Sequence, residues 1–180
     1  MNDYRDQIWS LIPLVLICVV LAAVASQCTF TTHGPTPGRV PSFDVQAALH
    51  DDARSLGFPV RDPAVPADWK PNSGNRETIA GPHGGTISTV GYITSNGTYL
   101  GLSQSDATEN ELADHVLSTR SPGGSRMEGA QKWTVYHVDG SEPAWIADFG
   151  TSRVLIKGAA DESAYATLAT AVGAAQPLRP

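Results

Sequence analysis

The sequence has little material for covalent chemistry. Of its two cysteines, Cys18 lies within an apolar run and Cys28 lies just after it, so the rest of the chain has none with which to form a disulfide. In a helix these two residues would lie roughly 15 Å apart, too far to bond to each other. The remaining chain must therefore be held together by a hydrophobic core, which a segment of this length can supply.

Positive charge is also scarce. Twelve Lys and Arg residues face eighteen Asp and Glu, which gives a net charge of −6. Domains that bind nucleic acid carry a basic patch or stripe, and anionic membrane surfaces attract basic segments. The acidic balance therefore argues against nucleic acid as a partner, and against a domain that lies flat on an anionic membrane surface.

Motifs for catalysis and metal binding are missing. The sequence has no phosphate-binding loop, dinucleotide fingerprint or nucleophile elbow, and the glycine-rich residues 81–85 precede an expected strand rather than a helix N-terminus. The five histidines lack the spacing of metal ligands. His50, Asp51 and Asp52 are adjacent, so on a helix they point in different directions and form a solvated face. We predict no enzyme activity, no metal and no cofactor.

Long apolar runs are absent except for one, from Ile8 to Ser26, which no charged residue interrupts. As a helix rising about 1.5 Å per residue, this run matches a hydrocarbon core of roughly 30 Å. Trp9 stands near its start, where interfacial aromatic residues occur. We therefore predict a transmembrane anchor at residues 8–27 that binds the lipid bilayer, after a short tail at residues 1–7.

Three fates are open for this segment. Ala23-Val24-Ala25 could form a signal-peptidase site, and Cys28 could carry a lipid. The N-terminal tail lacks the net positive charge of a signal peptide, and Gln27 rather than a small residue precedes Cys28. We favour an uncleaved single-pass anchor in the cell membrane. The flanking charges are nearly balanced, but the short leading tail favours a C-terminal domain outside the cytoplasm.

The chain after the anchor divides into a linker, one domain and a tail. Residues 28–42 are rich in Thr, Pro and Gly and have no apolar period, as is typical of a linker. Residues 43–175 are long enough for one extracytoplasmic domain. Residues 176–180 form a tail that we expect to fray.

Local signals within the domain predict its elements. Asp44 would cap a helix that Gly57 stops, and four prolines make residues 58–73 an extended arm. Asn96-Gly97 marks a hairpin turn in which both residues tolerate positive φ. The remaining elements are strands at 86–94, 98–105, 131–138, 143–150 and 152–159, a helix from a capping box at Thr108 to Leu117, and a helix at 162–172 capped by Asp161.

These elements predict an α+β fold. Hairpins form most of the connections between the expected strands, which favours an antiparallel sheet. We therefore expect a mostly antiparallel sheet of about five strands, with the helices packed on one face.

Large aromatic residues are the candidate contact residues of the domain: Trp69, Trp133, Trp145 and Phe58. Aromatic side chains of this size either fill a core or line a groove for an apolar ligand or partner. The sequence leaves both possibilities open, and we favour the core.

Several motifs give the chain a family resemblance. They include Arg5-Asp6 followed by Trp9-Ser10-Leu11, the F-P-V to N-S stretch from Phe58 to Ser73, and L-x-Q-S-D from Leu102 to Asp106. W-x-V-Y and P-A-W-I follow in residues 133–146. The chain resembles the actinobacterial membrane-anchored family catalogued as domain of unknown function 4245. The resemblance implies a single-pass envelope protein and carries over no activity and no site residues.

Anchor, acidic charge and missing catalytic motifs together predict a membrane-tethered extracytoplasmic interaction or accessory module. The expected partner is an envelope protein. The alternative is a binding module for a small apolar or lipid-like ligand, held between the sheet and the proline-rich arm with Trp69, Trp133 and Trp145 on its walls.

Overall fold

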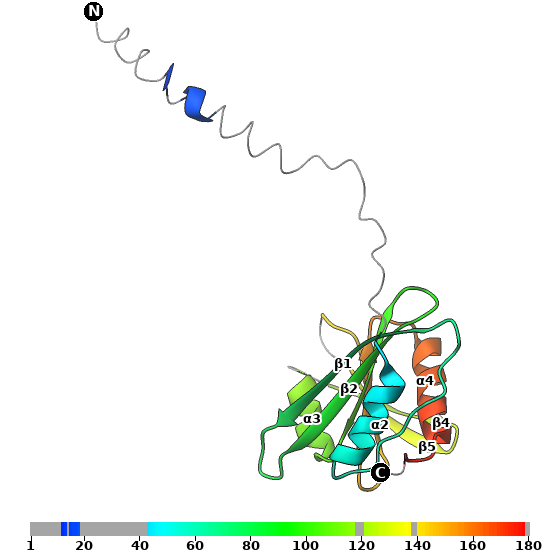
Figure 1. Ribbon diagram of the computed structural model, residues 1–180. Coiled ribbons are helices and arrows are strands. Elements are labelled where there is room, and N and C mark those ends of the chain that lie inside the picture. Colours follow the sequence, from blue (N-terminus) through cyan, green and yellow to red (C-terminus); the bar gives the residue numbers. More distant parts are fainter. Residues whose placement is uncertain (1–11, 14, 19–42, 118–120, 138–139, 179–180) are drawn as a thin grey trace, which may run out of the picture. The chain divides into compact units, whose positions relative to one another are not determined.

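The computed structural model describes residues 12–13, 15–18, 43–117, 121–137 and 140–178 (Figure 1). The chain divides into two units, Met1–Arg39 and Val40–Pro180. In the first unit the described residues are helical and exposed. The N-terminal tail, most of the expected anchor, Cys28 and the linker lie outside the described residues. No helix within the described part of the chain has the length and apolar character needed to cross a membrane.

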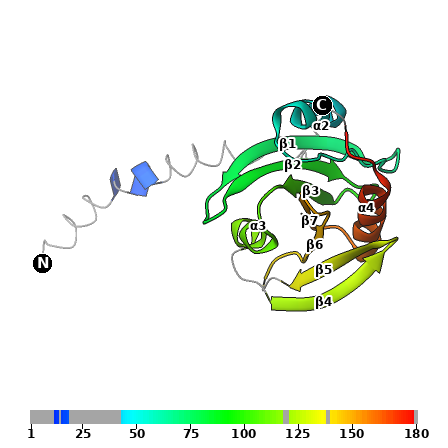
Figure 2. The same cartoon turned by 90° about the horizontal axis from the view of Figure 1, so that it is seen from below.

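The described part of the second unit contains a seven-stranded antiparallel sheet with strand order β1-β2-β3-β7-β6-β5-β4 (Figure 2). Hairpin-linked strands pair with each other, and β3 pairs with β7, where Leu102 lies opposite Ile156. This pairing joins the first three strands to the last four and confirms the predicted α+β class. The strands are β1 Lys70–Ile79, β2 Gly85–Ile93, β3 Tyr99–Ser105, β4 Ser121–Glu128, β5 Gln131–His137, β6 Ala144–Asp148 and β7 Arg153–Gly158.

Helices cover both faces of this sheet. The helices α2 (Val45–Ser55) and α4 (Glu162–Ala174) pack on one face, and α3 (Glu109–Val116) packs on the other. Figure 2 shows α3 and α4 on opposite sides of the sheet. The expectation that all helices share one face is wrong, because the inner strands carry apolar side chains on both faces and each face needs cover.

Each helix starts at the predicted cap. The side chains of Asp44, Thr108 and Asp161 accept hydrogen bonds from backbone N–H groups in the first turns of α2, α3 and α4. The end of α2 differs from the prediction. The helix ends at Ser55 and Leu56 is already extended, so Gly57 is not needed as a left-handed stop.

Two strands that the sequence did not predict, β1 and β4, form the two edges of the sheet. Pro71 and Pro122 lie within them, each beside an irregularity in the register. Proline is tolerated at edge strands and bulges because no ladder bond is lost there. The prolines and glycines that suggested loops therefore mark edge strands, and the expected count of about five strands was too low.

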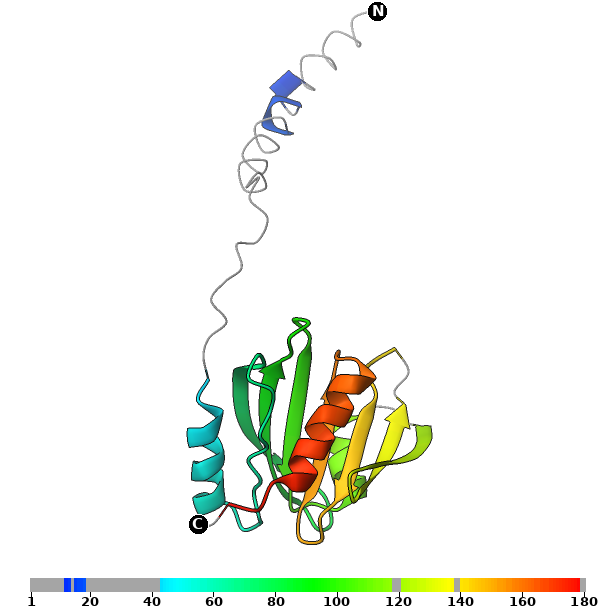
Figure 3. The ribbon, with the colours of Figure 1, turned by 90° about the vertical axis from the view of Figure 1, so that its right-hand side faces the viewer.

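The proline-rich arm lies against the face that α2 and α4 cover (Figure 3). Gln104 is 1% exposed and binds the arm twice, accepting from the Arg61 backbone N–H and donating to the Arg61 carbonyl, both at 2.8 Å. The Leu178 N–H donates to the Val60 carbonyl at 2.8 Å. The tail that we expected to fray is thus paired with the arm as far as residue 178.

Candidate functional site

The helix α3 covers part of its sheet face and leaves a groove beside it. Its apolar side packs on Ile87, Ile146 and Leu155. Farther along β2, β3 and β7 lies a groove of about 430 Å³, a size typical of small-ligand sites, which span roughly 300–1,000 Å³. Its lining residues are Glu77, Ile87, Thr89, Tyr99, Gly101, Ser103, His115, Val116, Glu142, Leu155, Lys157, Gly158 and Ala159.

Two hydroxyl groups lie on the floor of the groove, beside apolar side chains such as Ile87 and Leu155. Side chains alternate between faces along a strand, so Val90 and Leu102 enter the core while their neighbours Thr89 and Ser103 line the groove. Thr89 and Ser103 lie opposite each other on β2 and β3. Their hydroxyl oxygens are 2.8 Å apart, and either can donate. The floor therefore carries a hydroxyl pair, of which Thr89 is the more exposed member and Ser103 is 5% exposed.

At the end of this floor the exposed ring of Tyr99 packs over two glycines, Gly91 and Gly101. Gly91 and Gly101 are buried cross-strand partners. A Cβ atom on Gly91 would collide with the Ser73 hydroxyl oxygen and would lie 2.5 Å from Cε2 and 2.6 Å from the hydroxyl oxygen of Tyr99. A Cβ atom on Gly101 would lie 3.2 Å from that Tyr99 oxygen. The Tyr99 ring therefore lies over the glycine pair, and 38% of this residue remains exposed.

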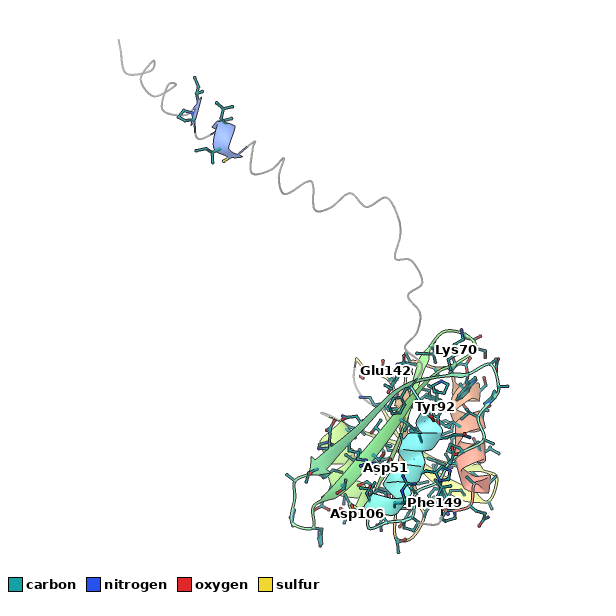
Figure 4. All side chains as sticks on the ribbon, viewed as in Figure 1. Asp51, Lys70, Tyr92, Asp106, Glu142 and Phe149 are labelled. Atoms are coloured by element: carbon teal, nitrogen blue, oxygen red, sulfur yellow. The ribbon has the colours of Figure 1, made fainter. Side chains whose placement is uncertain are left out.

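Charged groups of both signs line the groove. His115 on α3 and Glu77 on β1 form a contact of 2.9 Å between Nε2 and Oε2. Glu142 and Lys157 line the same groove, and Glu142 is labelled in Figure 4. Hydrogen bonds from its own backbone N–H and from the Ser141 hydroxyl lower the pKa of Glu142, and the charge of Lys157 adds to this. Two carboxylates and one ammonium group thus line the groove.

A smaller pocket of about 290 Å³ lies on the opposite face, beside the start of α4. The Arg126 guanidinium lies 4.2 Å from the ring centroid of Trp145, which lines this pocket. The same guanidinium pairs with Glu128 at 3.0 Å and with Glu162 at 2.5 Å. The charge of Arg126 is therefore already neutralised within the protein, which leaves the α3 groove as the better candidate site.

The four aromatic residues singled out by the sequence lie in the hydrophobic core. Phe58, Trp69, Trp133 and Trp145 are 5%, 7%, 0% and 3% exposed. Their ring neighbours differ, since Trp69 packs near Tyr92, Trp133 near Phe149 and Trp145 near Tyr165. None of the four lines the α3 groove, and the structure does not bring the three indoles together on one wall.

The acidic cluster on α2 differs from the solvated face expected of it. Asp52 is 2% exposed and accepts hydrogen bonds from the Ser88 hydroxyl and from Nε of Arg76. Its exposed neighbour Asp51, labelled in Figure 4, pairs with the same guanidinium at 2.6 Å. Arg76 lies on the unpredicted strand β1, so the sequence offered no partner for Asp52. Both Asp52 oxygens hold α2 to the sheet.

Sequence reasoning also missed the groove residues, although one signal for them exists. Gly91 and Gly101 lie equally far from Asn96 in the predicted hairpin. Two glycines at such positions face each other across the strands and leave a gap beside them. An aromatic residue near the turn, here Tyr99, is then placed to cover that gap.

Among the described residues, no group of three or more His, Cys, Asp or Glu side chains could hold a metal ion.

The fold and site define an α+β domain with one antiparallel sheet, a closed face and an open groove. The chain belongs to the family described as protein of unknown function (DUF4245), whose model matches residues 1–172. The resemblance seen in the sequence motifs is therefore confirmed. No curated protein and no solved structure shows a significant similarity to the chain.

Proposed function

We propose that this protein is a single-pass membrane protein that presents an extracytoplasmic binding module, with the α3 groove as its binding surface. The open groove is the observation that carries the proposal. It combines the volume of a ligand site with an exposed aromatic ring, a hydroxyl pair on its floor and charges of both signs. The uncharged run from Ile8 to Ser26 supports the tether.

An accessory role fits this domain better than catalysis. Asp52 has the most buried carboxylate among the described residues, and its two oxygens accept hydrogen bonds from Arg76 and Ser88. A general base needs a free oxygen within reach of its substrate. We therefore propose that the domain acts by binding a component of the envelope, with the lipid bilayer contacting residues 8–27.

The alternative, an apolar or lipid-like ligand between sheet and arm, has less support. Phe58, Val60 and Trp69 of the arm already fill that space. Gln104 fixes the arm backbone through two hydrogen bonds. A ligand there would have to displace buried aromatic side chains, which is costly. The α3 face offers a site that is already open.

Protease treatment of intact spheroplasts tests the tether. We expect the domain to be digested from outside while a short membrane-bound stub survives, as judged by blotting. A fully protected domain would place it on the cytoplasmic side. A mature chain that is released and starts near Ser26 would show cleavage instead of anchoring.

Site-specific photo-crosslinking tests the binding surface. A benzoylphenylalanine at position 99 lies in the groove, and one at position 127 lies on β4, where Met127 is 60% exposed. We expect an adduct with an envelope component from position 99 and none from position 127. Equal adducts at both positions, or none at either, would remove the groove as the binding surface.

A further inference from the structure

We propose that the α3 groove binds a neutral saccharide, with the Tyr99 ring as its stacking platform and the hydroxyl groups of Thr89 and Ser103 as its floor. This inference rests on the proposed function and names the chemical class of the ligand. It is carried by the way the chain seats Tyr99, by the hydrogen-bonding character of the lining and by the charge of the groove.

The two glycines under the Tyr99 ring lower the stability of the strands that contain them. Glycine inside a strand weakens it by roughly 0.5–1 kcal/mol relative to alanine, and this sheet places two, Gly91 and Gly101, opposite each other. A Cβ on Gly91 would collide with the ring. Two buried glycines thus hold one partly exposed aromatic ring at the groove. The negative face of such a ring attracts the polarised C–H groups on the apolar face of a pyranose.

The other lining groups match sugar hydroxyls, which both donate and accept hydrogen bonds. Thr89 and Ser103 can each donate and accept, the Glu142 carboxylate accepts, and the Lys157 ammonium donates. All four line the same groove as Tyr99. A polyhydroxylated ring that stacks on Tyr99 would find partners of both kinds around its edge.

The charges and hydrogen-bonding groups of the lining favour a neutral, hydroxyl-bearing ligand over the other small-ligand classes. Phosphate or carboxylate ligands favour arginine forks, whereas this groove has one lysine and two glutamates. An alkyl chain could contact Ile87, Val116 and Leu155 of the lining. It would also remove water from the Lys157 ammonium and the Glu142 carboxylate without replacing their hydrogen bonds, which costs free energy for each group. A neutral, hydroxyl-rich ring avoids both penalties.

Saturation-transfer difference NMR on the full chain in phosphatidylcholine nanodiscs tests the inference. The probes are the methyl pyranosides of glucose, galactose and mannose, with glucose 6-phosphate as the anionic comparison. We expect transfer to the ring protons of at least one neutral glycoside, and weaker transfer to the phosphate ester.

Variants locate the site. Tyr99→Ala should raise the Kd roughly tenfold, which is the loss of affinity expected when one aromatic contact is removed. Tyr99→Phe should keep near wild-type affinity because the ring remains. Thr89→Val keeps the shape and removes a hydroxyl, so it should also weaken binding, and Met127→Ala on β4 should leave binding unchanged. Circular dichroism of each variant confirms that it is folded.

The outcomes separate this inference from the proposed function. If no neutral glycoside receives saturation, or if Tyr99→Ala and Thr89→Val both bind as the wild type does, the saccharide site is wrong. When this occurs while the crosslinker at position 99 still yields an envelope adduct, the binding module stands and its ligand belongs to another class. When the crosslinker also fails, both proposals fall.

Discussion

The two faces of the sheet differ in how completely they are closed. On the α2–α4 face, apolar residues from the arm, the strands and both helices form one large buried cluster, which contains the three tryptophans of the domain. On the α3 face, a smaller and mainly aliphatic cluster lies under the helix, and the strands beyond it border the groove. One face therefore supplies most of the buried apolar surface, and the other is free to bind.

The same strands build both faces. In β7, Val154 and Ile156 are fully buried in the large cluster, whereas Lys157 lines the groove. Because side chains alternate between faces, a residue that stabilises the core and a residue that lines the groove can be neighbours in the sequence. Substitutions on the two faces should consequently affect different measurements.

The largest effect is expected on the closed face, from Trp69→Ala. Trp69 is 7% exposed and packs on Tyr92 with ring centroids 6.3 Å apart. Truncating a buried indole leaves a cavity and should lower the free energy of unfolding by roughly 3–5 kcal/mol. Urea unfolding followed by circular dichroism measures this loss. An unchanged midpoint would mean that the arm is not part of the folded core.

A smaller loss should follow from Asp52→Ala on α2. The substitution leaves the Ser88 hydroxyl and the Arg76 side chain without their buried acceptor, which should cost roughly 2 kcal/mol. Asp51→Ala is the matched control, since Asp51 pairs with the same arginine from an exposed position, where water screens the pair, and its loss should be clearly smaller than that of Asp52→Ala. Equal losses in the two variants would show that burial does not set the strength of this cluster.

The helix α3 on the open face should loosen in acid. The Glu111 carboxylate accepts hydrogen bonds from the backbone N–H of His83 at 2.9 Å and from Thr108, and these lower its pKa to about 2. The ordinary value is about 4.3, so its stabilisation is complete above that pH and is lost as the pH falls toward 2. The hydrogen-exchange protection factors of α3 should fall over this window, and Glu111→Gln should remove the dependence. A pH dependence that persists unchanged in Glu111→Gln would contradict the assignment to this carboxylate.

The sequence predicted what local signals determine. The helix caps and turns depend on residues a few positions apart, and the inner strands depend on runs of apolar and β-branched residues. The β2–β3 hairpin forms at Asn96-Gly97 as predicted, although of its residues Gly97 adopts positive φ, at 77°, and Asn96 does not. These features can be predicted without knowing which residues pack against them.

The features that the sequence missed depend on distant partners. β1 and β4 have poor strand propensity and form because β2 and β5 offer them free edges. Asp52 is buried because Arg76 on β1 reaches it. The groove requires the pairing of β3 with β7 and the position of α3. No local pattern encodes these contacts, so the choice between core and groove for the tryptophans stayed open.

The smallest effect on stability is expected from Tyr99→Ala, the aromatic truncation on the open face. Tyr99 keeps 38% of its surface exposed, so the loss of its remaining contacts should lower the free energy of unfolding by roughly 1 kcal/mol. Measured beside Trp69→Ala under the same conditions, it compares one aromatic side chain from each face. A loss as large as that of Trp69→Ala would mean that the glycine pair needs the ring as cover, and that Tyr99 belongs to the core. A small loss would show that the Tyr99 ring contributes little to folding although two buried glycines make room for it. This is expected of a ring whose role is binding.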